Sequence, residues 1–115
     1  MKIIITEEQY KELSDWDIYS QLSPWSRRRM DYVDIKSTLE HYISRNHKMI
    51  VEDPNEAVER LIHKVIWKTI PLHWNVNIED EEVEKYFGEL YPLIYKKYGE
   101  FIESEVERIY EKGEY

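Results

Sequence analysis

Residues 53–70 decide the fold, and they read Asp-Pro-Asn-Glu-Ala-Val-Glu-Arg-Leu-Ile-His-Lys-Val-Ile-Trp-Lys-Thr-Ile. Apolar residues recur in this stretch at helical spacing, while charged residues occupy the opposite face. Asp53 with Glu56 three residues later forms a capping box, and Pro54 suits the first helical position because its missing N–H is not needed there. We therefore predict an amphipathic helix over 54–70, ending before the next proline.

A second long helical pattern covers residues 79–112. Pro92 lies inside it and should kink the helix, because its ring removes a backbone hydrogen bond and clashes with the carbonyl four residues earlier. Gly99 should weaken the helix further, by about 1 kcal/mol relative to alanine. The pattern predicts a long, kinked C-terminal helix.

Shorter helices are expected earlier in the chain. A capping box at Thr6 predicts a helix over 7–14, and Ser23 followed by proline predicts the start of a helix over 24–45. Three short β-prone runs, at 2–5, 48–51 and 75–78, would allow a small sheet but are equally ordinary as lead-ins to helices. The expected fold is mainly α, a compact bundle of about four helices around Leu39, Ile43, Leu61, Ile62, Val65 and Ile66.

Composition limits the class of protein. The chain has 115 residues, of which 42% are hydrophobic, so it can form one ordinary domain with a core. There are no cysteines, which excludes disulfide frameworks and thiol nucleophiles. The longest apolar runs, such as Ile3 to Ile5, are far shorter than the ~20 residues that cross a bilayer. We expect a single soluble domain over 1–115 in the cytoplasm of a cell, without membrane contact.

The net charge of −8 is unevenly distributed. Residues 79–115 hold twelve acidic and five basic groups, whereas 24–50 hold three acidic and six basic ones. An acidic chain is unlike most nucleic-acid binders, which need a strongly basic surface. The first turns of the predicted helix contain Arg27, Arg28 and Arg29. Cations are unfavourable there because the helix dipole places partial positive charge at the N-terminus. We expect the acidic C-terminal helix to compensate the positive charge of these arginines. An acidic partner or a phosphate backbone could compensate it instead.

No catalytic or cofactor motif is present. Walker loops, dinucleotide glycine patterns and serine nucleophile elbows are all absent. Glu59 and His63 have metal-like spacing on one helix, but no motif supplies the further ligands that a metal needs, so we interpret them as a stabilising surface pair. The spaced carboxylates of the C-terminal helix would also suit a protein that mimics DNA. Lysines are interleaved with them, however, as is typical of an ordinary solvated helix face. We expect no enzyme activity, no metal and no cofactor.

The C-terminal helix carries two apolar stripes, more than one core requires. Its second stripe steps by three or four residues, as a helix-packing seam does. We predict that this stripe contacts another protein chain, either a second copy or a different protein; a central position of the helix, with neighbours on both flanks, would instead bury it. The predicted interaction residues are Tyr91, Tyr95, Tyr98, Ile102, Val106 and Ile109.

One resemblance covers about a tenth of the chain. Residues 2–10, Lys-Ile-Ile-Ile-Thr-Glu-Glu-Gln-Tyr, resemble the start of many short uncharacterised proteins of tailed bacteriophages, which share an Ile-Ile-Ile-Thr-Glu-x-Gln phrase. The resemblance carries no catalytic residue. It implies a phage origin and a virion or assembly accessory protein, acting in the host cell or incorporated in the virion.

The sequence thus favours a non-enzymatic interaction or structural protein, with a phage accessory component as its specific form. The alternative is a small phage regulator that binds a host enzyme or nucleic acid through Arg27, Arg28 and Arg29.

Overall fold

The structure is a computed structural model that describes residues 15–28, 30–70 and 81–113. All regular structure in these ranges is helical and none of it is a strand, which confirms the predicted mainly α class. The helices are α2 (Trp16–Tyr19), α3 (Pro24–Arg27), α4 (Ile35–Arg45), α5 (His47–Glu52), α6 (Pro54–Thr69) and α7 (Glu81–Lys112). No helix in the described ranges is both long and apolar enough to cross a membrane.

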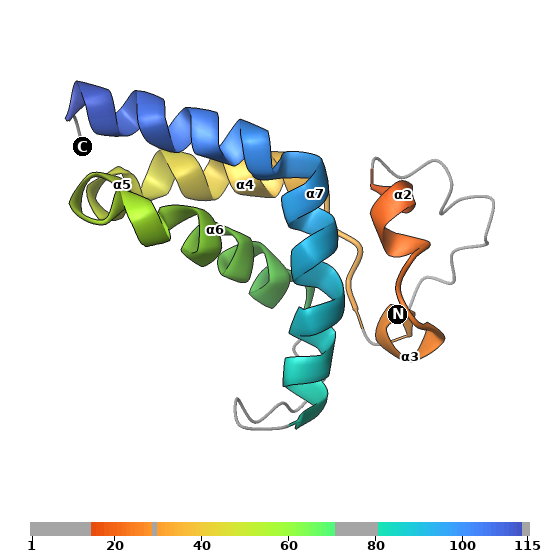
Figure 1. The fold of residues 1–115 in the computed structure, drawn as a ribbon. Helices are drawn as coiled ribbons and strands as arrows, with labels where there is room; N and C mark the ends of the chain where they lie inside the picture. Colours follow the sequence, from red (N-terminus) through yellow and green to blue (C-terminus); the bar gives the residue numbers. More distant parts are fainter. Residues whose placement is uncertain (1–14, 29, 71–80, 114–115) are drawn as a thin grey trace.

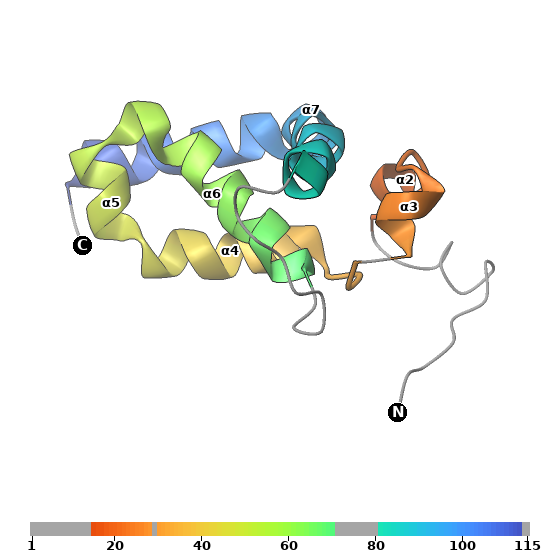
Figure 2. The same ribbon diagram turned by 90° about the horizontal axis from the view of Figure 1, so that it is seen from below.

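Helix α7 lies between the other helices (Figures 1 and 2). α2 and α3 lie on one side of its N-terminal half, and α4, α5 and α6 lie on the other side. Its most extensive contacts are with α6. Figure 1 shows that α7 changes direction in its middle, and Pro92 lies inside it. Proline interrupts the backbone ladder of a helix, so the predicted kink has its expected cause.

The predicted core is confirmed. All six residues named from the helical period are buried, and Leu39, Leu61, Ile62, Val65 and Ile66 have no exposed surface. α7 contributes a comparable apolar row from its own length. Its buried residues are Val83, Tyr86, Leu90, Ile94, Gly99, Ile102, Val106 and Ile109.

The prediction of one helix over 24–45 is wrong. α3 ends at Arg27, and α4 begins at Ile35 after Asp34, whose side chain accepts a hydrogen bond from the Ser37 amide at 3.0 Å. The chain between them pairs with other segments: the Asp31 amide donates to the Thr69 carbonyl at 2.7 Å. A tertiary hydrogen bond of this kind replaces the helical one, and Asp34 supplies a new N-cap.

The predicted β-prone run at 48–51 is also wrong, because it lies within helix α5. Ile50 is fully buried there. The capping box at Asp53 is wrong in detail: Asp53 is the N-cap residue of α6, but its side chain makes no capping hydrogen bond and lies 3.5 Å from Arg60 instead. The predicted helix over 7–14 and the runs at 2–5 and 75–78 lie outside the described residues.

Candidate functional site

A row of aromatic rings runs along the contact between α6 and α7. We call it the aromatic seam, and it consists of His63 and Trp67 from α6 and Phe87, Tyr91 and Tyr95 from α7. The residues from each helix are spaced by four, so they project from one face of that helix. Because both rows face the same way, the two helices together present a single aromatic surface.

Ring contacts connect the seam from end to end. The Trp67 ring meets Phe87 at a centroid distance of 5.2 Å, and His63 lies 5.5 Å from Phe87 and 5.6 Å from Tyr91. These three contacts are edge-to-face, the geometry that aromatic quadrupoles favour. Tyr91 and Tyr95 are stacked at 6.3 Å with an interplanar angle of 7°.

The two ends of the seam are exposed. Trp67 is 38% exposed and Tyr95 is 44% exposed, and the only other large hydrophobic side chain so exposed among the described residues is Tyr110. Phe87 and Tyr91 between them are half-buried. Exposed aromatic rings that are joined in one surface often mark interaction sites, so this surface is a candidate for binding.

The exposed Tyr95 ring is held in a defined orientation. It packs over Gly99, where the absence of a side chain leaves room for the ring. Its hydroxyl donates a hydrogen bond to Glu103 Oε1 at 2.8 Å, and this bond raises the pKa of Tyr95. A ring fixed at both its face and its hydroxyl loses little conformational entropy when a partner covers it.

A second carboxylate borders the same end of the seam. Burial and the nearby Glu59 carboxylate together raise the pKa of Tyr91. Glu59 is exposed on α6, one helical turn before His63, and Glu103 is exposed on α7. The tyrosine end of the seam therefore combines two aromatic faces with two acidic groups.

The predicted interaction stripe is divided by the structure. Tyr91 and Tyr95 belong to the seam, but Tyr98 donates its hydroxyl hydrogen to Asp15. The remaining three residues of the stripe, Ile102, Val106 and Ile109, are buried in the core. They lie in the C-terminal half of α7, which packs against α4, α5 and α6, so they are buried within this chain. Burial within one chain is the alternative that the sequence had left open.

The sequence interpretation missed three of the five seam residues. His63 was considered only as half of a pair with Glu59, and neither Phe87 nor Trp67 was predicted as an interaction residue. The spacing of four from Glu59 through His63 to Trp67 was a usable signal. Its significance depended on which face of α6 lies beside α7, and a helical period alone does not determine that.

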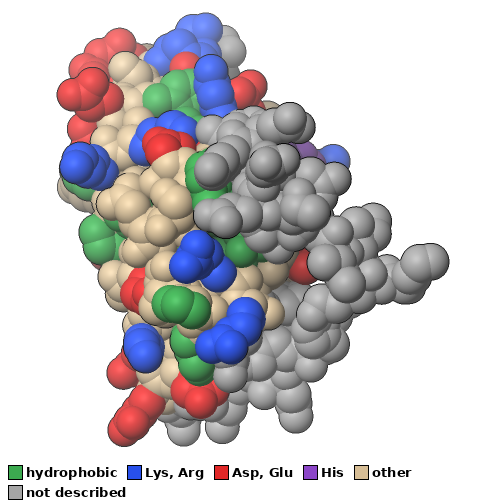
Figure 3. All heavy atoms as spheres, turned by 90° about the vertical axis from the view of Figure 1, so that its right-hand side faces the viewer, with side chains coloured by type: hydrophobic (Ala, Val, Ile, Leu, Met, Phe, Trp, Pro, Cys, Tyr) green, Lys and Arg blue, Asp and Glu red, His purple; other side chains and the backbone are tan. Residues whose placement is uncertain are grey.

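The arginine cluster forms no comparable site. Arg27 and Arg28 take part in no ion pair within the described ranges, and Arg29 lies outside them. The Arg28 side chain instead donates to the Pro24 carbonyl at 3.2 Å. The expected compensation by the acidic C-terminal helix is therefore not found for Arg27 and Arg28. Figure 3 shows the side of the molecule on which α2 and α3 lie, where basic, acidic and apolar side chains alternate in its described part.

Two polar anchors attach α2 and α3 to α7, the first at a buried carboxylate and the second at a partly buried one. In the first, the Asp15 carboxylate accepts hydrogen bonds from the Ile35 amide at 2.8 Å, from Lys97 at 3.2 Å and from the Tyr98 hydroxyl. The Asp15 side chain has no exposed surface. Burial lowers the pKa of Lys97, but its hydrogen bonds to Asp17 and Asp15 outweigh this and raise it.

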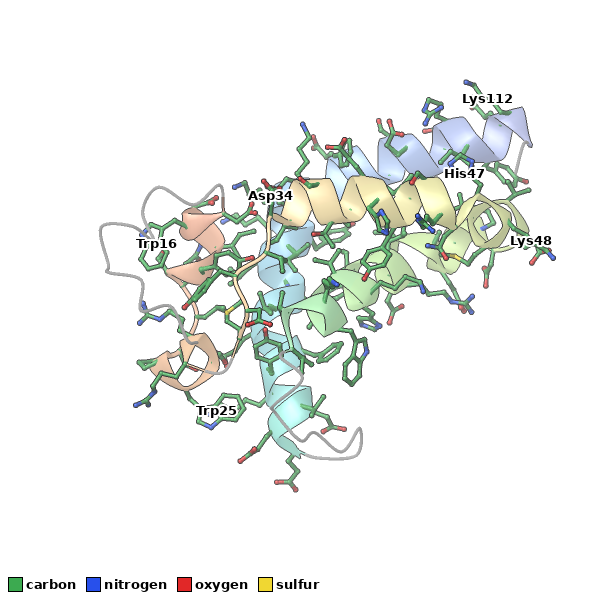
Figure 4. All side chains as sticks on the ribbon, turned by 180° about the vertical axis from the view of Figure 1, so that it is seen from behind. Trp16, Trp25, Asp34, His47, Lys48 and Lys112 are labelled. Atoms are coloured by element: carbon green, nitrogen blue, oxygen red, sulfur yellow. The ribbon has the colours of Figure 1, made fainter. Side chains whose placement is uncertain are left out.

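In the second anchor, Glu89 of α7 accepts hydrogen bonds from the start of α3. Its donors are the Ser23 amide at 2.8 Å and the Ser26 hydroxyl at 2.5 Å. Nearby, Lys85 lies 5.2 Å from the ring of Trp25, which Figure 4 labels beside the N-terminal half of α7. These contacts position α3, so we interpret both anchors as structural.

Glu89 makes a pH prediction possible. Burial opposes its ionisation, but the hydrogen bonds from Ser26 and Ser23 outweigh this and lower its pKa below the usual 4.5. The folded pKa is therefore below the unfolded one, so the ionised group stabilises the fold above about pH 4.5, and this contribution is lost as the pH falls through the folded pKa. We expect Glu89→Gln to lower the free energy of unfolding by about 1 kcal/mol at pH 7.

Chemical denaturation at pH 7 and at pH 3 measures this effect. The difference between wild type and Glu89→Gln should shrink at the lower pH, because the contribution of the ionised group is lost as the pH falls towards and through the folded pKa of Glu89. A difference that stays constant between the two pH values would show that the Glu89 charge does not support the anchor.

An open groove lies elsewhere, between α4, the start of α5 and the C-terminal half of α7. Its volume is about 360 Å³. His47, labelled in Figure 4, lies at one end of it. Lys36 lies 5.7 Å from the Phe101 ring centroid, and Arg108 pairs with Glu105 at 2.7 Å. The lining side chains carry charges of both signs, so the groove favours neither an anion nor a cation.

A metal site requires several histidine, aspartate or glutamate side chains that converge on one point. Among the residues that the structure describes, no three His, Asp or Glu side chains are clustered in a way that could hold a metal ion. Glu59 and His63, the pair with metal-like spacing, lie at the seam, where the His63 ring contacts aromatic rings. No protein-family model, curated protein or solved structure matches this chain.

Proposed function

We propose that the protein is a non-enzymatic protein–protein interaction domain and that the aromatic seam is its contact surface. The observation that carries the proposal is the continuous series of ring contacts from Trp67 to Tyr95, which ends in an exposed ring on each side. Aromatic residues are enriched in protein interfaces, and they dominate binding energy where they are fixed and desolvated on binding.

The biological setting of this proposal comes from the first ten residues. Their resemblance to phage proteins supports a phage accessory protein, with a phage or host protein as the partner. The alternative, a regulator that binds nucleic acid or a host enzyme through the arginine cluster, has weaker support. Its described residues, Arg27 and Arg28, form no ion pair with a described residue, and charges of both signs alternate on the side of the molecule where α3 lies (Figure 3).

A peptide-display selection tests the proposal without knowledge of the host. A random peptide library is selected on the wild type and counter-selected on a Trp67→Glu/Tyr95→Glu double variant, which changes only the two exposed ends of the seam. We expect peptides that bind the wild type and lose at least tenfold in affinity on the double variant, because truncating central aromatic residues removes about 1–2 kcal/mol or more.

A Tyr110→Glu variant is the matched control, since Tyr110 is also exposed on α7 but lies outside the seam. Selected peptides should bind this variant as they bind the wild type. Peptides that bind all three proteins equally, or a selection that enriches none, would contradict the proposal.

A further inference from the structure

We propose that the tyrosine end of the aromatic seam receives an arginine or lysine side chain of the partner protein. This inference rests on the proposed function, and it adds the chemistry of the partner's contact residue. The site consists of the Tyr91 and Tyr95 rings with the Glu59 and Glu103 carboxylates at their border.

The rings provide the first part of the site. The face of a tyrosine ring is electronegative and attracts cations that lie within about 6 Å of its centroid. This protein uses that interaction elsewhere: Lys85 lies over Trp25, and Lys64 of α6 lies over Tyr42 of α4. Among the described residues, no lysine or arginine occupies the faces of Tyr91 and Tyr95.

The carboxylates provide the second part. Neither Glu59 nor Glu103 forms an ion pair with any described residue. The nearest basic residue along α6, Arg60, is already paired with Glu56 at 2.8 Å and lies 3.5 Å from Asp53. The chain therefore places two negative groups beside two rings over which no described lysine or arginine lies.

Charge also determines which class of partner fits. The chain has a net charge of −8, and the site adds local negative charge, so a phosphate backbone would be repelled. A cationic side chain gains from the rings and from the carboxylates together. We expect arginine to bind better than lysine, because its planar guanidinium can stack on a ring while it donates two hydrogen bonds to a carboxylate.

Titration with defined peptides tests the inference, followed by NMR of the tyrosine ring signals. The probes are acetyl-Leu-Arg-Leu-amide and acetyl-Leu-Gln-Leu-amide, which differ in charge at one position. We expect both to perturb Tyr91 and Tyr95, with the arginine peptide binding about fivefold more tightly, as cation–π and ion-pair contributions at exposed sites suggest.

Two variants locate the origin of this preference. Glu59→Gln/Glu103→Gln keeps an acceptor for the Tyr95 hydroxyl but removes both charges, so the two peptides should then bind more nearly equally. Glu52→Gln on α5 removes one charge away from the seam and should leave the preference intact. A preference that survives unchanged in the double variant would overturn the inference, because the two carboxylates would then contribute nothing to cation binding.

The two proposals fail in different ways. Equal binding of both peptides at the tyrosines would overturn the arginine inference and leave the seam as an interface. An arginine peptide that perturbs signals only outside the seam would overturn the inference as well. Display-selected peptides that ignore the Trp67→Glu/Tyr95→Glu change would instead overturn the proposed function.

Discussion

Replacing Ile102 with glutamate is expected to unfold the protein, whereas replacing Tyr95 with glutamate is expected to leave it folded. Both residues lie on α7, seven positions apart, in the stripe that the sequence pattern treated as one surface. Ile102 has no exposed surface, while Tyr95 is 44% exposed. Burying an unpaired carboxylate costs several kcal/mol, on the order of the whole stability of a small domain.

Thermal melting followed by circular dichroism distinguishes the two variants. Ile102→Glu should show little cooperative unfolding, and Tyr95→Glu should melt within a few degrees of the wild type, since exposed substitutions change stability by about 0.5 kcal/mol. The opposite order would mean that the stripe faces a partner at Ile102 and the core at Tyr95.

The second large effect is expected at Asp15. In Asp15→Ala the Ile35 amide, the Lys97 ammonium and the Tyr98 hydroxyl all lose an acceptor in a site with no exposed carboxylate surface. Removing one partner of a buried, hydrogen-bonded charge typically costs about 3–5 kcal/mol. We expect a loss of that size in the free energy of unfolding, measured by urea denaturation.

Asp17→Ala is the matched control, because Asp17 also pairs with Lys97, at 2.7 Å, but its side chain is 62% exposed. Exposed ion pairs contribute at most about 1 kcal/mol, so this variant should remain close to the wild type. Equal destabilisation by the two substitutions would show that burial of Asp15 is not what fixes α2 to α7.

The helices that the sequence predicted correctly are those whose signals are local. The apolar period of α6 and the proline at its first position require no knowledge of the rest of the chain. The prediction of a helix over 24–45 failed because the Asp31 amide is satisfied by Thr69, 38 residues away. Asp34, which caps α4 in the structure, was not predicted as a helix start, because the apolar period continues across it.

The candidate site was predicted only in part, for a similar reason. The spacing of Tyr91 and Tyr95 showed that α7 has more than one apolar face, and both residues lie in the seam. Whether Ile102 is core or surface depends on the neighbours of α7 on each side, and these are set by tertiary packing. His63 and Trp67 join the site because α6 places them beside Phe87.

Hydroxyl-radical footprinting of the protein, alone and with a display-selected peptide bound, tests the central claim most directly. The claim predicts that oxidation of Trp67 and Tyr95 falls several-fold on binding. Oxidation of Tyr110, which lies on α7 like Tyr95 and is 53% exposed, should stay unchanged. Unchanged oxidation of Trp67 and Tyr95, with protection at Tyr110 or on the face that carries Arg27 and Arg28, would contradict it.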